Sequence, residues 1–216
     1  MNPINMLSGL MVQAVNFFYS LYPNYGVAIL LLTAAIKLAL YPLTLQSMQQ
    51  TFAIQKIQPK IKELQEKLKD KPKDLQQRIM ELYKEEKVSP LGGCLPMLLQ
   101  LPFFIALFFG IQSMHFEGPG ATFLWIKDLA KPDPAYVLVV LIALATYWAQ
   151  KTMPQPKEGA YSTMNLVMPP FIAFVSAPFP AGVQLYWLAQ TLISAAQQAY
   201  IFRKHITKKE EGAKTK

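Results

Sequence analysis

Five apolar stretches follow one another along the chain, at residues 25–45, 91–114, 135–150, 162–181 and 182–202. A helix needs about 20 apolar residues to cross the hydrocarbon core of a bilayer, which is about 30 Å thick. The first, second and fifth stretches meet this length. The third is short, and the fourth contains four prolines, so we expect it to be kinked or shallow, with neighbouring helices satisfying its freed backbone groups. The pattern predicts an all-α integral membrane protein with five transmembrane helices.

The segment ahead of the first stretch, residues 1–24, has apolar side chains at helical spacing, namely Ile4, Leu7, Met11, Val15 and Phe18. This spacing predicts an amphipathic helix that lies on the outer membrane surface. The alternative is a frayed leader. No Lys or Arg precedes the first apolar stretch, so a cleavable signal peptide is not expected.

Basic residues are distributed unevenly among the loops. With five crossings, 18 of the 20 loop bases fall on one side of the membrane, in 46–90, 151–161 and 203–216. The loop 115–134 on the other side holds only two. The positive-inside rule therefore places the N-terminus outside and the tail 203–216 in the cytoplasm.

The long loop 46–90 is expected to form a cytoplasmic antiparallel helical hairpin. Apolar stripes at helical spacing mark its two halves, Ile54, Ile57, Ile61, Leu64 and Leu68 in the first and Leu75, Ile79 and Leu82 in the second. Residues 70–72 break the pattern, so each stripe can be buried against the other. Glu63 and Lys67 form a favourable i,i+4 pair. The pattern leaves two roles open: a solvated hairpin whose bases set topology or touch anionic headgroups, or a docking arm for a partner.

Composition and motifs exclude several other classes. A chain that is 52% hydrophobic and 16% charged is not intrinsically disordered. The single cysteine, Cys94, cannot form a disulfide within the chain. A phosphate-binding loop motif is absent, and the two histidines, His115 and His205, lie far apart in the sequence. No catalytic residue, metal site or cofactor is therefore expected, and the protein is not expected to be an enzyme.

Lys37 lies inside the first apolar stretch. It precedes Gln46 by nine residues, or about 13 Å of helix, which is farther than a lysine side chain reaches without strain. A charge near the middle of a membrane costs at least about 2.5–3.5 kcal/mol, and Asp and Glu are absent from all five stretches. Water, carbonyls or polar side chains must therefore solvate the ammonium group. This requirement favours a hydrated cavity with one fixed positive charge.

Polar side chains that could line such a cavity occur on four of the five stretches. Eight residues are candidates for a substrate groove: Lys37, Thr33, Tyr41, Gln100, Gln150, Gln184, Trp187 and Gln190. On the last stretch the polar stripe continues through Ser194 and Gln197. The alternative for each glutamine is an interhelical hydrogen bond worth about 0.6–2 kcal/mol.

Several motifs resemble those of the YidC membrane-protein insertases, the YidC/Oxa/Albino group. They are YPLTLQSMQ (41–49), LQEKLKDKPKDLQQRIMELYKEEKVSP (64–90), PLGGCLPMLLQLPFFIALF (90–108), FLWIKDLAKPDP (123–134) and LYW (185–187). The similarity covers nearly the whole chain. It implies a core-only member that lacks a large periplasmic domain. The resemblance also implies a groove open to cytoplasm and lipid, where Lys37 stands in place of the family's usual arginine and Thr33 and Trp187 match groove positions.

The resemblance further implies the activity and the partners. The expected function is that of an insertase and chaperone of the bacterial cytoplasmic (inner) membrane that works as a monomer and without nucleotide hydrolysis. Its expected partners are nascent membrane proteins, the lipid bilayer, the ribosome, the Sec translocon and the signal-recognition machinery. The bases expected to dock partners lie in the hairpin and the tail, namely Lys67, Lys69, Lys71, Lys73, Arg78, Arg203, Lys204, Lys208 and Lys209.

Two other functions fit parts of the pattern. A small multi-pass transporter could use Lys37 as an anion site, although transporters usually show paired repeats with broken helices, which the five dissimilar stretches do not. A membrane anchor could recruit a soluble partner through the hairpin, but it offers no reason for Lys37.

Overall fold

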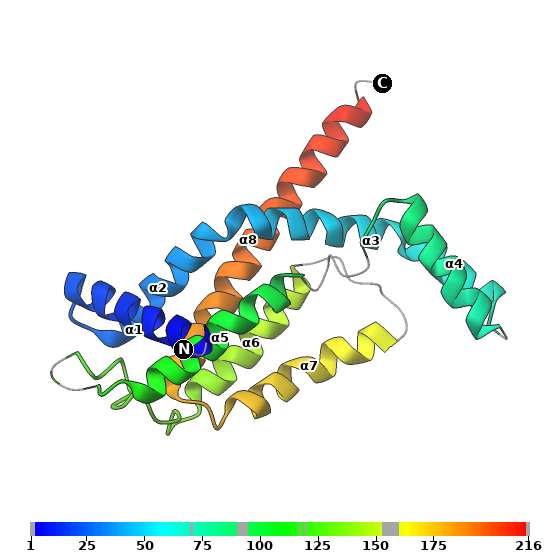
Figure 1. Ribbon diagram of the computed structural model, residues 1–216. Coiled ribbons are helices and arrows are strands. Elements are labelled where there is room, and N and C mark those ends of the chain that lie inside the picture. Colours follow the sequence, from blue (N-terminus) through cyan, green and yellow to red (C-terminus); the bar gives the residue numbers. More distant parts are fainter. Residues whose placement is uncertain are drawn as a thin grey trace. The chain divides into compact units, whose positions relative to one another are not determined.

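The computed structural model of the chain describes residues 3–69, 71–89, 95–116, 118, 120–152 and 160–214. Among these residues it contains no β-strand, which confirms the predicted all-α class. Its helices are α1 (Pro3–Leu21), α2 (Tyr25–Ala39), α3 (Tyr41–Lys67), α4 (Pro72–Glu85), α5 (Leu95–Ser113), α6 (Val137–Lys151), α7 (Ala160–Ser176) and α8 (Ala181–Lys214), as Figure 1 shows. They form two compact units, Met1–Leu40 with Gln100–Lys216, and Tyr41–Leu99.

The first unit is built around α8. Both α2 and α6 pack against α8, while α1 packs on α2 and α7 on α6 (Figure 1). Its core includes the buried side chains of Val15 from α1, Ile29 from α2 and Ile111 from α5. Gly182 lets the start of α8 enter this core, because a Cβ there would lie 3.0 Å from Cδ1 of Ile111 and 3.2 Å from Cδ1 of Ile29.

The N-terminal segment forms a helix, α1, that is apolar on two sides. Met11 and Val15 of the predicted stripe are buried, and Leu7 and Phe18 pack against the same core. Ile4, the first residue of the stripe, is exposed. The other side of α1 exposes further large apolar side chains, those of Met6, Leu10, Phe17 and Leu21.

The structure divides the first predicted span, 25–45, between two helices. α2 ends at Ala39, the N–H of Leu40 closes its last turn on the carbonyl of Ile36, and α3 begins at Tyr41. Pro42 explains the break, because it has no N–H to continue the helical bonding and its ring clashes with the carbonyl four residues earlier.

The loop between α5 and α6 is tied to the start of α6 by one buried carboxylate. Asp133 is only 2% exposed. Its side chain accepts hydrogen bonds from Trp125 Nε1 (3.0 Å) and from the backbone N–H groups of Ala135 (3.1 Å) and Leu138 (2.8 Å). The bond from Leu138, the second residue of α6, satisfies an N–H group that the first turn of a helix leaves unpaired, and the bond from Ala135 holds the backbone just before the helix. Asp133 therefore fastens the loop to α6.

The same loop also holds the start of α8. The N–H of Ala181 donates to the carbonyl of Lys131 (2.7 Å), and the N–H of Gly182 donates to the carbonyl of Leu129 (2.9 Å). These bonds satisfy first-turn donors of α8, as Asp133 does for α6. One loop thus sets the starting points of two helices in the first unit.

The other end of α8 extends beyond the predicted span. Residues 203–214, expected as a separate basic tail, continue the same helix to Lys214. α7 likewise runs through Pro169 and Pro170 and ends at Ser176, two residues before Pro178.

The second unit contains a pair of antiparallel helices, α3 and α4. Ile57, Ile61 and Leu82 are buried between them, and residues packed around this cluster include Leu64, Ile79 and Tyr83. All but Tyr83 belong to the apolar stripes in the sequence. Lys60 and Glu86 form an ion pair between the helices, and by accepting a hydrogen bond from the ammonium the Glu86 carboxylate raises the pKa of Lys60 above its ordinary value.

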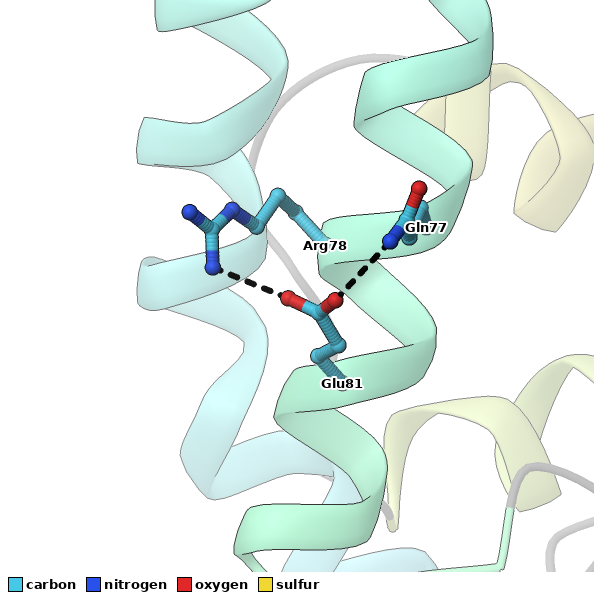
Figure 2. A network of polar contacts seen from close by, with 3 residues as sticks. All are labelled: Gln77, Arg78 and Glu81. Atoms are coloured by element: carbon cyan, nitrogen blue, oxygen red, sulfur yellow. Dashed lines mark hydrogen bonds and ion pairs between the residues drawn. The ribbon is translucent and has the colours of Figure 1, made fainter.

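Polar side chains about one turn apart pair on the surfaces of both helices. The expected pair of Glu63 and Lys67 is present at 4.0 Å on exposed α3. Figure 2 shows that Glu81 on α4 accepts from Arg78 (2.9 Å) and from Gln77 (3.2 Å), so the guanidinium of Arg78 already has an acidic partner.

Length and hydropathy alone single out few membrane-crossing helices among the described residues. One helical segment, Ile4–Leu21, is long and apolar enough by itself, and α2 passes only when taken together with α3. Shorter apolar helical segments are Gln100–Ser113, Val137–Lys151 and Leu166–Ser176.

Candidate functional site

The site is centred on Lys37, in the last turn of α2. Its Nζ donates a hydrogen bond to Oγ of Ser194 on α8 (2.9 Å), and Nε2 of Gln197 donates to the carbonyl of Lys37 (3.4 Å). Ser194 and Gln197 are three residues apart and so lie on one face of α8. A cation in the last turn also faces the negative end of its own helix, which stabilises it.

The charge of Lys37 is not neutralised within the described part of the chain. An ammonium group has three N–H donors. Ser194 accepts one of them with a neutral hydroxyl, and no carboxylate of the described residues forms an ion pair with Lys37. The half-buried ammonium can therefore bind a further acceptor, and an anionic one most strongly.

Glutamine oxygens on α6 and α8 are buried without a partner among the described residues, and one of them belongs to Gln197, whose amide nitrogen contacts Lys37. Oε1 of Gln150 on α6 and Oε1 of both Gln190 and Gln197 on α8 are buried and accept no hydrogen bond from the described residues. A buried polar atom without a partner is costly unless water or a ligand supplies a donor. These acceptors suit water or the N–H groups of an incoming peptide chain.

Two of the eight candidate residues are occupied with backbone groups instead. Thr33 is buried, and its Oγ1 donates to the carbonyl of Ile29 in the preceding turn (2.7 Å). Gln184 is also fully buried, and its Nε2 lies within hydrogen-bonding distance of three carbonyls at the end of α7: Ser176 (2.9 Å), Phe179 (3.1 Å) and Ala177 (3.3 Å). Gln184 thus closes the proline-rich turn between α7 and α8.

Two more candidates join α5 to α8. Nε2 of Gln100 donates to Oη of Tyr186, a buried phenol that the sequence pattern had not marked as part of the site. Trp187 is half-buried, with its ring centroid 5.3 Å from that of Phe104 in an edge-to-face arrangement and 6.2 Å from that of Phe179. These rings form an aromatic cluster contributed by α5, by α8 and by the turn between α7 and α8.

The polar contacts of Lys37 that the structure describes are with Ser194 and Gln197, and not with any of the other seven candidates. Tyr41 is the first residue of α3 and belongs to the second unit. Ser194 and Gln197 had a signal in the sequence, the polar stripe of the last stretch, but were not among the eight. Asp133, which bonds both Trp125 and the first turn of α6, was not found by this approach, because it lies in a loop and belongs to no helical stripe.

The candidate docking bases are mostly exposed. In the second unit they lie at the end of α3, in the α3–α4 turn and on the first two turns of α4, with exposed side chains at Lys67, Lys69, Lys71, Lys73 and Arg78. In the first unit Arg203 and Lys204 are exposed on α8, and Lys208 and Lys209 follow on the same helix.

Comparisons with known proteins agree with the motif resemblance. Residues 17–209 match the family described as 60Kd inner membrane protein. The membrane protein insertase YidC of Francisella tularensis subsp. novicida (strain U112) is 40% identical over 200 residues, which cover 93% of this chain and 36% of that protein. The YidC of Francisella tularensis subsp. tularensis (strain WY96-3418) matches to the same extent.

A solved structure is also similar. It is described as an active YidC insertase crystal structure with the first transmembrane domain resolved, and it matches with a TM-score of 0.75 and 29% identity over 91% of this chain and 46% of that one. The chain spans about a third of the length of the curated relatives it matches. With the family match extending over most of its residues, the chain belongs to the 60Kd inner membrane protein family, the family of the YidC insertases.

Proposed function

We propose that this chain is a membrane-protein insertase and chaperone that moves nascent transmembrane segments into the bilayer without hydrolysing nucleotide. The observation that carries the proposal is the ammonium of Lys37, which sits between α2 and α8 with a neutral hydroxyl as its hydrogen-bond partner. The amide nitrogen of Gln197 contacts the carbonyl of Lys37, and its buried oxygen accepts no hydrogen bond from the described residues, which supports a hydrated groove next to the ammonium.

The membrane arrangement that we propose has five spans with the N-terminus outside and the C-terminus in the cytoplasm. The spans are 25–45, 91–114, 135–150, 162–181 and 182–202. Large apolar side chains exposed on α5 to α8 support lipid contact, because monomeric soluble proteins rarely expose apolar patches of this extent. Examples, one from each helix, are Phe109, Leu144, Phe174 and Leu192.

Insertion would proceed in two physical steps. A nascent segment enters the groove from the cytoplasm with its short polar tail, and the groove's water and amides lower the cost of desolvating that tail. Lys37 attracts acidic residues of the tail, and an inside-negative potential favours their outward movement by about 2.3 kcal/mol per charge per 100 mV. The apolar segment then partitions into lipid, driven by about 25 cal/mol per Å² of apolar surface.

The distance that a polar tail must cross within the bilayer would also be short. The 15 residues of α6 span about 22 Å at a rise of about 1.5 Å per residue, well below the roughly 30 Å of hydrocarbon. A short third span beside a proline-containing fourth thins the bilayer around them. A thinner bilayer shortens the distance over which a polar tail is desolvated.

Site-specific photo-crosslinking tests the groove directly. A photoreactive residue at position 37 or 194 is expected to crosslink a ribosome-stalled nascent membrane protein, since both positions belong to the proposed path. Position 192 is the matched control, because Leu192 is exposed on a different side of α8. Equal crosslinking from 192 and 194 would contradict a path along the Lys37 face.

We further propose that the hairpin and the C-terminal part of α8 bind ribosomes through their bases. Binding of lysines to RNA phosphates releases counterions, so ribosome co-sedimentation should weaken steeply as salt rises. Replacing Lys67, Lys69, Lys71 and Lys73 by glutamine should flatten this salt dependence. Arg78→Gln should change it less, because Arg78 already pairs with Glu81 (Figure 2). Co-sedimentation that does not respond to salt would refute the proposal.

A further inference from the structure

A tight turn at Phe123–Ile126 projects two apolar side chains from the first unit. The backbone groups of Phe123 and Ile126 exchange two hydrogen bonds, both of 2.9 Å. Ile126 is buried in the core, and Phe123 packs against it. The two ends of the turn are therefore firmly mounted, and the residues at its tip, Leu124 and Trp125, point outward.

Leu124 at the tip is doubly unfavourable in water. Its side chain is 74% exposed, and its backbone has φ +53°, in the left-handed region that is strained for residues with a Cβ. Glycine or asparagine would adopt this backbone more easily. A strained backbone that displays a leucine indicates that the tip has an apolar environment to enter.

Trp125 next to it combines an exposed part with a polar group that is bonded inside the protein. Its indole N–H donates to the buried carboxylate of Asp133, while the residue as a whole remains 38% exposed. The indole N–H is thus satisfied within the protein, although the residue is partly exposed. Lys127, two residues on, is exposed and could reach lipid phosphates.

The tip is also continuous with the outer face of α6. Asp133 bonds both Trp125 and the first turn of α6, so the tip lies at the N-terminal end of that helix. The exposed face of α6 is apolar along its length and begins with an exposed tyrosine; its residues are Tyr136, Val137, Val140, Leu141 and Leu144. In the proposed membrane arrangement this face contacts lipid.

We infer that the turn Phe123–Ile126 is a lipid anchor, with Leu124 and Trp125 inserted where acyl chains meet headgroups at the bilayer surface. The inference rests on the proposed membrane arrangement. Because the same loop bonds Ala181 and Gly182, insertion of the tip sets the depth at which α8 begins. It thereby also sets the depth of Ser194, the partner of Lys37.

Tryptophan fluorescence of the full-length chain in vesicles tests the anchor. The chain has three tryptophans, Trp125, Trp148 and Trp187, so substitution of two by phenylalanine leaves one reporter. The vesicles contain phosphatidylethanolamine and phosphatidylglycerol with bromine placed either near the headgroup or deep in the acyl chain. We expect Trp125 to be quenched most by the shallow bromine, to resist aqueous iodide, and to lose bromine quenching in Leu124→Asn, which tolerates the left-handed backbone. Leu124→Met should retain the quenching.

A variant in which Trp148 is the only tryptophan tests the proposed membrane arrangement separately from the lipid anchor. It is half-exposed near the other end of α6, so it reports whether α6 faces lipid at all. Quenching of Trp148 but not Trp125 by brominated lipid would overturn the anchor and leave the arrangement intact. Quenching of neither would overturn both. A blue-shifted Trp125 that is shielded from iodide but insensitive to bromine would show that protein covers the tip, which also overturns the anchor.

Discussion

Replacing Lys37 by alanine is expected to reduce the insertion of substrates with acidic outer tails by about tenfold, whereas Lys37→Arg is expected to preserve it. An attraction of about 1.4 kcal/mol between the ammonium and a carboxylate suffices for a factor of ten. Near a partly buried site, two charges 4 Å apart interact by about this amount or more. Arginine keeps the charge, and alanine leaves only the neutral hydroxyl of Ser194.

Reconstituted vesicles and protease protection of the inserted substrate provide the measurement. Substrates with neutral tails form the internal comparison, because they should be affected much less. Lys131→Ala is the matched control for protein charge, since Lys131 is an exposed base in the loop before α6 and its side chain is not part of the proposed anchor. If the alanine variant at position 37 inserts acidic-tailed substrates as fast as the parent, the charge has no part in the mechanism.

Asp133→Ala is expected to lower the free energy of unfolding by about 3 kcal/mol, because it removes the acceptor for three donors at once. Leaving a buried donor unsatisfied costs about 1–3 kcal/mol, and bonds to a charged acceptor lie at the upper end. One donor, the N–H of Leu138, lies in the first turn of α6, a second, the N–H of Ala135, lies just before the helix, and the third is the indole of Trp125. The loop should therefore loosen together with the helix start, and the emission of Trp125 should change before the whole chain unfolds.

Denaturant titration in detergent micelles, followed by helical content and by Trp125 emission, measures this effect. Asp133→Asn should cost less, because one amide oxygen can still accept from a backbone donor. Asp128→Ala is the nearby control: Asp128 accepts from the N–H of Ala130 and pairs with exposed Lys131, so its loss should cost less than about 1 kcal/mol. An Asp133→Ala variant as stable as the Asp128→Ala variant would show that water replaces the lost bonds.

The helices and their faces could largely be predicted because they depend on local spacing. Buried Ile57 and Ile61 belong to one stripe that repeats every three or four residues, and buried Leu82 belongs to a second such stripe; a helix places the members of each stripe on one side wherever it lies. The break before Pro42 was missed although the proline was visible. Hydropathy continues unchanged through Leu43 and Leu45, and an average over a window does not detect the loss of one backbone donor.

The composition of the site was harder to predict, because polar side chains select partners by proximity in space. Gln184 and Gln190 belong to one helical stripe, and the side-chain oxygens of both are buried without a donor among the described residues, yet only the amide nitrogen of Gln184 is bound by carbonyls at the α7–α8 turn. Thr33 shares a face with Lys37, but its hydroxyl bonds its own helix. Spacing along one helix cannot distinguish these outcomes.

The order of apolar and polar residues by itself determined the all-α class, the stripes of the hairpin and the presence of an uncompensated cation in an apolar stretch, since each follows from residue type and helical period. Only the tertiary structure decided that Ser194 and Gln197 accompany Lys37 and that Asp133 links the loop to α6. These contacts join residues up to 160 positions apart, and the packing of α2 on α8 brings such residues together.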